Sequence, residues 1–166
     1  MSEPFGYSES IPEEIREIFM WLCQDVASLN DKWSIYKGLY SDSDITDLLT
    51  CIAKHTFATI EESLRADITM CICRLADPTS SCGYENVSFK ALADSNLIPG
   101  NLSQLINEFI DLCRPVVLYR NKQIAHNDKN ILLKPKENIL PGISRSLIEE
   151  IVGKAGAILN LIIQTL

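Results

Sequence analysis

The sequence predicts an all-α fold, namely a four-helix bundle with one or two short extra helices. Apolar residues recur at intervals of three and four along most of the chain, which is the period of amphipathic helices. No segment alternates apolar and polar residues as a half-buried strand does. The chain has 166 residues, of which 46% are hydrophobic, and this suits one core. We therefore expect a single helical domain over residues 1–166, with residues 1–10 as a flexible N-terminus.

The N-terminal part of the chain predicts a helix over residues 11–29 and a short second helix over residues 32–39. Pro12 and the two glutamates after it suit a helix N-terminus, where backbone N–H groups are unpaired and the helix dipole favours negative charge. The polar pair Asn30–Asp31 interrupts the apolar pattern, and either residue could cap the second helix. A break in the helix is therefore expected at this pair.

The longest helix is predicted from Asp44 to Asp77. This segment contains neither Pro nor Gly and carries a continuous apolar stripe, so at 1.5 Å per residue the helix is about 50 Å long. Ser43 or Asp44 can cap its start, and Pro78 ends it. Residues 78–87 are rich in turn formers and are expected to form a loop.

A short helical stretch is predicted from Ser88 to Leu97, and the next long helix begins near Asn101-x-x-Gln104, which resembles a capping box. Pro115 lies inside that apolar pattern and predicts a kink or a restart of the helix. The helix is expected to end near His126, where the chain continues with turn-forming residues.

An extended loop is predicted over residues 131–143, because this segment contains Pro135 and the pair Pro141-Gly142. A final amphipathic helix then begins at Ser144 or Ser146. With this helix, four main amphipathic helices are available to bury one another's apolar faces, as in a bundle.

Six cysteines are present, but none forms a CxxC pair, and the only histidines are His55 and His126. A zinc site needs about four ligands at short paired spacings. We interpret the cysteines as free thiols in a reducing cytoplasm and expect no metal and no other cofactor. The chain has no leader-like N-terminus and no run of about 18 apolar residues, which indicates a cytoplasmic protein without a membrane partner.

The net charge of −7 argues against a protein that coats nucleic acids, but the charge is unevenly distributed. Residues 114–136 contain six Lys and Arg residues against a single acidic residue, Asp128, whereas residues 1–77 are strongly acidic. One compact basic segment in an acidic protein is either an anion-binding site or a solvated loop. Charge alone does not distinguish the two, so the other residues of the segment decide.

The chain contains no Gly-rich phosphate loop, no GxSxG elbow and no HExxH motif. The informative stretch lies within the basic segment, where His126 follows Arg120 by six residues. A histidine can move a proton near neutral pH, and an arginine can hold phosphate oxygens and stabilise developing charge. With RNA, the neighbouring 2′-hydroxyl can be the nucleophile, so such a pair could cleave a phosphodiester without a metal.

Two interpretations of this pair remain open from the residues alone. On an ideal helix Arg120 and His126 are about 120° apart, so their side chains converge only if the helix loosens near His126. The alternative is a surface arginine followed by a histidine that caps a helix. In that case the protein is a non-catalytic helical module that binds a nucleotide or a protein partner through the basic segment 114–136.

This stretch resembles the HEPN superfamily, whose signature is an Arg and a His separated by four to six residues, often with Asn directly after the Arg. Two further motifs make the chain similar to the AbiU-type abortive-infection branch of that superfamily. These motifs are Asp31-Lys32-Trp33-x-x-Tyr36 and Arg74-Leu75-x-Asp77-Pro78. The resemblance spans roughly residues 10–165 and agrees with the predicted order of helices.

The resemblance implies a HEPN-type bundle that acts as a metal-independent endoribonuclease in a bacterial phage-defence or toxin system. It implies a homodimer in which two motifs line one cleft, and RNA products with a 2′,3′-cyclic phosphate and a 5′-hydroxyl. If the roles of the family motif apply to the matching residues here, His126 is the general acid or base, Arg120 is the anion clamp and Asn121 is a positioning residue. Three basic residues would then contact the RNA backbone: Arg114, Lys122 and Lys129. Two residues of the same stretch are candidates for supporting roles: Tyr119 and Asp128.

The chain departs from the family pattern at Asp128. Many toxin HEPN proteins that pair with a nucleotidyltransferase antitoxin have a tyrosine there, so nucleotidylation at this position is not expected, although an antitoxin or other defence partner remains compatible. Arg74 and Asp77 admit two interpretations, as members of the site or as a pair that closes the long helix. We favour the structural role.

Overall fold

The computed structural model describes residues 11–124 and 142–166, and all structural statements concern these residues. The predictions for residues 1–10, for the helix end near His126 and for most of the loop 131–143 lie outside them. Four long helices are present: α1 (Glu13–Tyr40), α2 (Ser43–Leu75), α4 (Gly100–Tyr119) and α6 (Arg145–Thr165). Between α2 and α4 lie the strands β1 (Ser80–Ser81) and β2 (Tyr84–Glu85) and the short helix α3 (Phe89–Ala93). A π-helical segment, η1 (Arg120–Ile124), continues α4.

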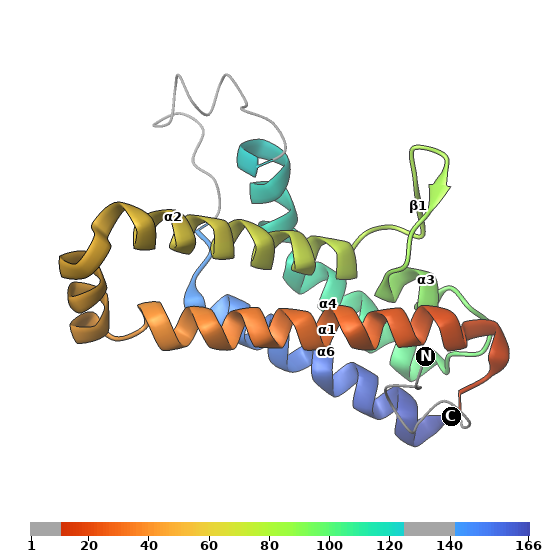
Figure 1. The fold of residues 1–166 in the computed structure, drawn as a ribbon. Coiled ribbons are helices and arrows are strands. Elements are labelled where there is room, and N and C mark those ends of the chain that lie inside the picture. The colour runs from red at the N-terminus through yellow and green to blue at the C-terminus, as the bar shows by residue number, and fades with distance from the viewer. Residues whose placement is uncertain (1–10, 125–141) are drawn as a thin grey trace.

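The four long helices close into a bundle, so the predicted all-α class is confirmed. Helix α1 packs against α2 and α6, and α4 packs against the same two helices from the other side (Figure 1). Helix α3 covers one end by packing on α1 and α4. The largest fully buried side chains include Phe19, Leu22, Leu29, Ile72, Leu75, Phe89, Phe109 and Ile151.

Helix α1 is continuous, so the predicted break at Asn30–Asp31 is wrong. Both residues are exposed on the outer side of the helix. On the inner side, Leu29, Trp33 and Tyr36 continue the buried stripe, and the Trp33 and Tyr36 rings stack with their centroids 5.4 Å apart. Burying such side chains stabilises the fold by about 1.5–3 kcal/mol each, whereas the low helix propensity of Asn and Asp costs about 0.7 kcal/mol or less per residue.

Helix α2 differs from the prediction at its start and in its middle. Its N-cap is Asp42, whose Oδ1 accepts a hydrogen bond of 2.8 Å from the Asp44 N–H, so neither Ser43 nor Asp44 is the cap. The helix is broken at Ala53, which has φ −160° and ψ 71°, and it bends at this end (Figure 1). Alanine is the best helix former, so the break has no local signal in the sequence. The helix ends just before Pro78, as predicted.

The predicted loop over residues 78–87 contains a minimal hairpin. Ser80 pairs with Glu85 and Ser81 with Tyr84 in an antiparallel register. The two turn residues, Cys82 and Gly83, have positive φ values of 52° and 85°, as a tight two-residue hairpin turn requires. Two-residue strands are too short for an alternating pattern, which is why the sequence indicated only a loop.

Helix α4 begins at Gly100 without a side-chain cap, so the predicted capping box at Asn101 is wrong. The Gln104 side chain instead donates a hydrogen bond to Glu108. Helix α4 also continues through Pro115, so the helix does not restart there. Cys113 and Val116, on either side of Pro115, are fully buried, and this packing keeps the segment helical although Pro cannot donate the usual hydrogen bond.

Helix α6 begins as predicted, because the Ser144 hydroxyl accepts a hydrogen bond of 3.1 Å from the Leu147 N–H. Its first turns are tied to α1, since Trp33 and Lys37 both donate hydrogen bonds to the Glu149 carboxylate. All six cysteines are free, as predicted. None of the helices in the described ranges is both long and apolar enough to cross a membrane.

Candidate functional site

The position of Arg120 follows from the packing of α4. The buried residues of this helix recur at intervals of three and four, and the next step after Val116 falls on Arg120. The segment η1 packs against α2, so the Arg120 side chain enters the bundle next to the end of α2 and is only 21% exposed. The sequence thus places a permanently charged guanidinium at a position where the helix buries its side chains.

The Arg120 guanidinium faces the carboxylate of Asp77, with 3.5 Å between Nη2 and Oδ1. Asp77 follows the last turn of α2, and its side chain is 26% exposed. Strong charged hydrogen bonds measure about 2.7–2.9 Å, so this pair is loose. The Arg120 Nε is buried and has no hydrogen-bond partner among the residues that the structure describes. The guanidinium therefore keeps unused donor capacity for an anion.

Burial dominates the electrostatics around this pair. It raises the pKa of Asp77, and the nearby Arg120 and Arg74 guanidinium groups only partly oppose this effect. Burial also raises the pKa of Cys73 to about 11 and that of Cys113 to about 12. Both thiols are therefore protonated at neutral pH and are not poised as nucleophiles.

The raised pKa of Asp77 predicts how its replacement changes stability with pH. The folded protein holds the Asp77 proton to a higher pH than the unfolded chain, so ionisation of this group costs stability above the ordinary pKa of 3.8. As pH rises from about 3.8 through the folded-state pKa, wild type should lose unfolding free energy relative to Asp77→Asn. Urea unfolding at a series of pH values measures this difference.

Asp94 provides the control with the opposite sign. Lys90 donates a hydrogen bond of 2.6 Å to Asp94, which lowers the pKa of this carboxyl. The stability that Asp94 contributes is fully present above the ordinary pKa of 3.8 and is lost as pH falls through its folded-state pKa. The free energy of unfolding of wild type should therefore rise relative to that of Asp94→Asn as pH rises over this range. If the free energy of unfolding of wild type rises with pH relative to that of Asp77→Asn, as expected for Asp94, the pKa of Asp77 is not raised in the folded protein.

Arg74 and Asp77 do not form an ion pair with each other at the end of α2, although the Arg74 guanidinium is near enough to lower the pKa of Asp77. Arg74 instead lies 3.6 Å from Asp25 on α1, and its Nη2 donates to the Cys71 sulfur at 3.3 Å. Asp77 pairs with Arg120, and this ion pair was not predicted from the sequence. One signal was available, because the apolar period of α4 places Arg120 inside, where a charge requires an acidic partner.

The other predicted site residues that the structure describes differ in exposure. Asn121 is exposed, whereas Tyr119 and Lys122 are half-buried. Arg114 is exposed and pairs with Asp111 on its own helix at 2.9 Å. Arg114 precedes Arg120 by six residues, which is about 120° around an ideal helix, and the two arginines pair with different carboxylates.

Three predicted site residues lie outside the described part of the chain: His126, Asp128 and Lys129. The structure does describe how the chain approaches them. At Arg120 the helix changes from α to π, which widens the turn over Arg120–Ile124. Single π-helical turns are frequent at functional sites.

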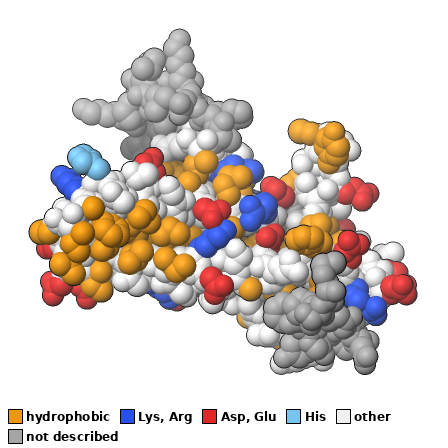
Figure 2. All heavy atoms as spheres, viewed as in Figure 1, with side chains coloured by type: hydrophobic (Ala, Val, Ile, Leu, Met, Phe, Trp, Pro, Cys, Tyr) orange, Lys and Arg blue, Asp and Glu red, His pale blue; other side chains and the backbone are white. Residues whose placement is uncertain are grey.

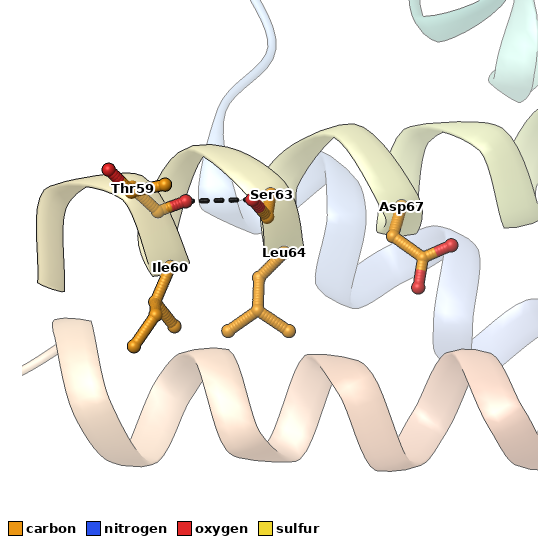
Figure 3. A pocket seen from close by; sticks show the side chains of 5 residues that line it. All are labelled: Thr59, Ile60, Ser63, Leu64 and Asp67. Carbon is orange, nitrogen blue, oxygen red and sulfur yellow. Dashed lines mark hydrogen bonds between the residues drawn. The ribbon is translucent and has the colours of Figure 1, made fainter. Parts of the chain in front are cut away.

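A group of three or more His, Cys, Asp or Glu side chains able to hold a metal ion does not occur within residues 11–124 and 142–166. A shallow pocket on α2 is lined by five residues of that helix (Figure 3): Thr59, Ile60, Ser63, Leu64 and Asp67. The Arg120–Asp77 pair at the end of α2 is therefore the candidate site that the described residues build.

Comparison with known families identifies the chain. The model of the AbiU2 family, HEPN_AbiU2, matches residues 12–166. The chain belongs to the AbiU2 family of HEPN proteins. The resemblance to the AbiU-type branch is thereby confirmed, and this AbiU2 chain is a HEPN domain related to abortive infection. Neither the comparison with curated proteins nor that with solved structures gives a match.

Proposed function

We propose that this AbiU2-family domain is a metal-independent endoribonuclease of a bacterial phage-defence or toxin system and that it acts in the cytoplasm. The observation that carries the proposal is the state of Arg120. It is largely buried, loosely paired with one carboxylate, and has a buried donor without a partner among residues 11–124 and 142–166. A guanidinium with this free capacity suits a phosphate, and the only histidine of the basic segment follows it by six residues.

The proposed reaction is attack of the RNA 2′-hydroxyl on the adjacent phosphorus. His126 accepts the 2′-hydroxyl proton or donates a proton to the leaving 5′-oxygen. The bond from O2′ to phosphorus forms and the bond from phosphorus to O5′ breaks, which leaves a 2′,3′-cyclic phosphate and a 5′-hydroxyl. Arg120 stabilises the charge on the non-bridging oxygens in the transition state, and Asn121 positions the phosphate.

Asp77 is proposed to hold the Arg120 guanidinium in place until a phosphate binds. A single carboxylate at 3.5 Å fixes one edge of the guanidinium but is too distant to saturate it. Arg114, Lys122 and Lys129 are proposed to contact the RNA backbone, a role that predicts weaker binding as salt increases.

The test is incubation of the protein with total RNA in the presence of excess EDTA, followed by analysis of the new RNA ends. The proposal predicts cleavage that resists EDTA and yields 2′,3′-cyclic phosphates with 5′-hydroxyls. Cleavage that EDTA abolishes, or products with 3′-hydroxyls, would overturn the mechanism. RNA that stays intact, together with binding of a nucleotide or a partner protein, would instead support the non-catalytic module.

A further inference from the structure

Arg74 lies one turn before Asp77 at the end of α2, and the proposed reaction gives it no role. The Asp77 N–H donates a hydrogen bond of 3.3 Å to the Arg74 carbonyl oxygen, so the two residues are neighbours on one turn. The Arg74 and Arg120 guanidinium groups both act on the Asp77 carboxylate and lower its pKa against the effect of burial. Two arginines from distant parts of the chain are therefore close to one carboxylate.

Arg74 belongs to a contiguous row of three cations. Lys32 on α1 and Arg74 on α2 both donate to the Cys71 sulfur, each at 3.3 Å, and Arg74 in turn shares Asp77 with Arg120. Figure 2 shows Lys and Arg side chains, together with acidic ones, gathered over the middle of the face that α1 and α2 form. A polyanion bound at Arg120 would therefore meet further cations along α2.

The cations of this row differ in how firmly a carboxylate holds them. Asp67 points from α2 toward α1 in Figure 3, and its Oδ2 lies 2.8 Å from the Lys32 Nζ, the distance of a full charged hydrogen bond. The Arg74 Nη2 lies 3.6 Å from the Asp25 Oδ1, which is too long for a hydrogen bond. Lys32 is thus held by its carboxylate, whereas Arg74 is only loosely paired.

The Arg74 guanidinium has donors to spare. Its contacts with the Cys71 sulfur and with Asp25 both use Nη2, and a thiol sulfur is a weak acceptor. Its Nη1 and Nε make no hydrogen bond within residues 11–124 and 142–166. The side chain is 46% exposed, so these donors are accessible from solvent. Arg74 thus shares with Arg120 the capacity to bind an anion, and it is the more accessible of the two.

A strand of RNA would bring such an anion to Arg74. Every nucleotide carries one negative phosphate, so a strand whose scissile phosphate is at Arg120 has a further phosphate one nucleotide away. Proteins bind single-stranded nucleic acids through positive charges that follow the backbone. The planar fork of an arginine matches the oxygens of a phosphate in geometry as well as in charge.

We propose that Arg74 forms a second phosphate site, which binds the phosphate next to the scissile one in single-stranded RNA. The strand then leaves Arg120 along α2 in the direction of Lys32. Asp25 holds the Arg74 guanidinium in the free protein and releases it when the phosphate binds. The inference rests on the proposed ribonuclease function, because it concerns the same substrate. Binding is nevertheless measured without cleavage, so loss of catalysis and loss of the second site are separate results.

Fluorescence anisotropy with a short 2′-O-methyl RNA, in EDTA and at several salt concentrations, tests the second site. The methyl group blocks the nucleophile, so this RNA binds but is not cleaved. Each phosphate contact with a single strand contributes about 0.7 to the slope of log K against the logarithm of the salt concentration. Arg74→Gln should therefore reduce the slope by about 0.7 and weaken binding on the order of tenfold. Arg74→Lys keeps the charge and should keep the slope.

Arg65→Gln is the matched control. Arg65 is an exposed arginine on the same helix, nine residues before Arg74 and therefore about 180° away around the helix, so its replacement should leave slope and affinity unchanged. An Arg74→Gln slope equal to that of wild type would overturn the second site even if the protein cleaves RNA. A wild type that does not bind this RNA would overturn it as well. The expected change in slope without cleavage of ordinary RNA would support the site and reject the ribonuclease.

Asp25→Asn gives a prediction of opposite sign, which a variant that merely loosened the fold would not show. Removal of the carboxylate that competes for Arg74 should tighten binding by about twofold to fivefold, the range over which exposed ion pairs contribute. Asp31→Asn is its control, because it also removes a negative charge from α1 but on the exposed outer side of the helix. Equal effects of the two variants would show that Asp25 does not compete with the phosphate and would contradict the proposed site.

Discussion

Replacement of His126 by alanine is expected to lower the rate of RNA cleavage by about 10²–10⁴-fold, the range over which general acid–base catalysis contributes. The proposed site has no other histidine, since His55 lies on α2 beyond the break at Ala53. No second group with an ordinary pKa near 7 can therefore replace the imidazole. The measurement is the single-turnover cleavage rate of a defined RNA in EDTA, followed by gel electrophoresis.

Gln123→Ala is the matched control for this loss. Gln123 is exposed in the same π-helical segment, three residues before His126, and has no role in the proposed site. Its replacement should leave the rate within about twofold of wild type, because most surface substitutions change stability by less than about 0.5 kcal/mol. If His126→Ala cleaves RNA as fast as Gln123→Ala, His126 is not the proton-transfer residue.

Replacement of Phe109 by alanine is expected to lower the free energy of unfolding by about 3–5 kcal/mol. The Phe109 ring is fully buried and meets the Phe89 ring edge-on, with 5.0 Å between the centroids. Its removal leaves a cavity between α3 and α4 and deletes the aromatic contact that joins them. For a chain of this length, the melting temperature should fall by on the order of 10 °C.

Leu105→Ala, one turn earlier on α4, separates this packing effect from helix propensity. Leu105 is partly exposed on the outer side of α4, so its truncation should cost about 1 kcal/mol or less. Calorimetry of both variants gives the comparison. Equal destabilisation by the two substitutions would show that the contact between Phe109 and Phe89 does not hold α3 on the bundle.

The apolar period was sufficient to predict the four helices. Helices α1, α4 and α6 bury stripes spaced by three and four residues, whereas α2 has buried residues only from Ile68 to Leu75. The period failed where packing overrode local preference. Asn30 and Asp31 remain helical because Leu29 and Trp33 are buried on either side of them, and Pro115 remains helical between two buried residues. The break at Ala53 could not be predicted, because alanine favours a helix and the surrounding pattern is uninterrupted.

The site was predictable in part. The motif in the sequence singled out Arg120, and the structure explains its setting through the buried stripe of α4. The partner of Arg120 was not found, because a contact between residues 43 positions apart depends on how α4 and η1 pack against α2. The sequence contains many acidic residues, and no signal in it selects Asp77 as the partner of Arg120. The motif Arg74-Leu75-x-Asp77-Pro78 also suggested that Asp77 pairs with Arg74.

The central claim is that Arg120 and His126 act on one phosphate, and a double-mutant cycle of cleavage rates tests it most directly. Arg120→Lys keeps the charge beside Asp77 but loses the planar fork, so it isolates the clamp with little loss of folding. Groups that act as a unit have non-additive effects. Arg120→Lys/His126→Ala should therefore cleave RNA no more slowly than His126→Ala alone. Rate losses that multiply in the double variant would show two independent sites and contradict the claim.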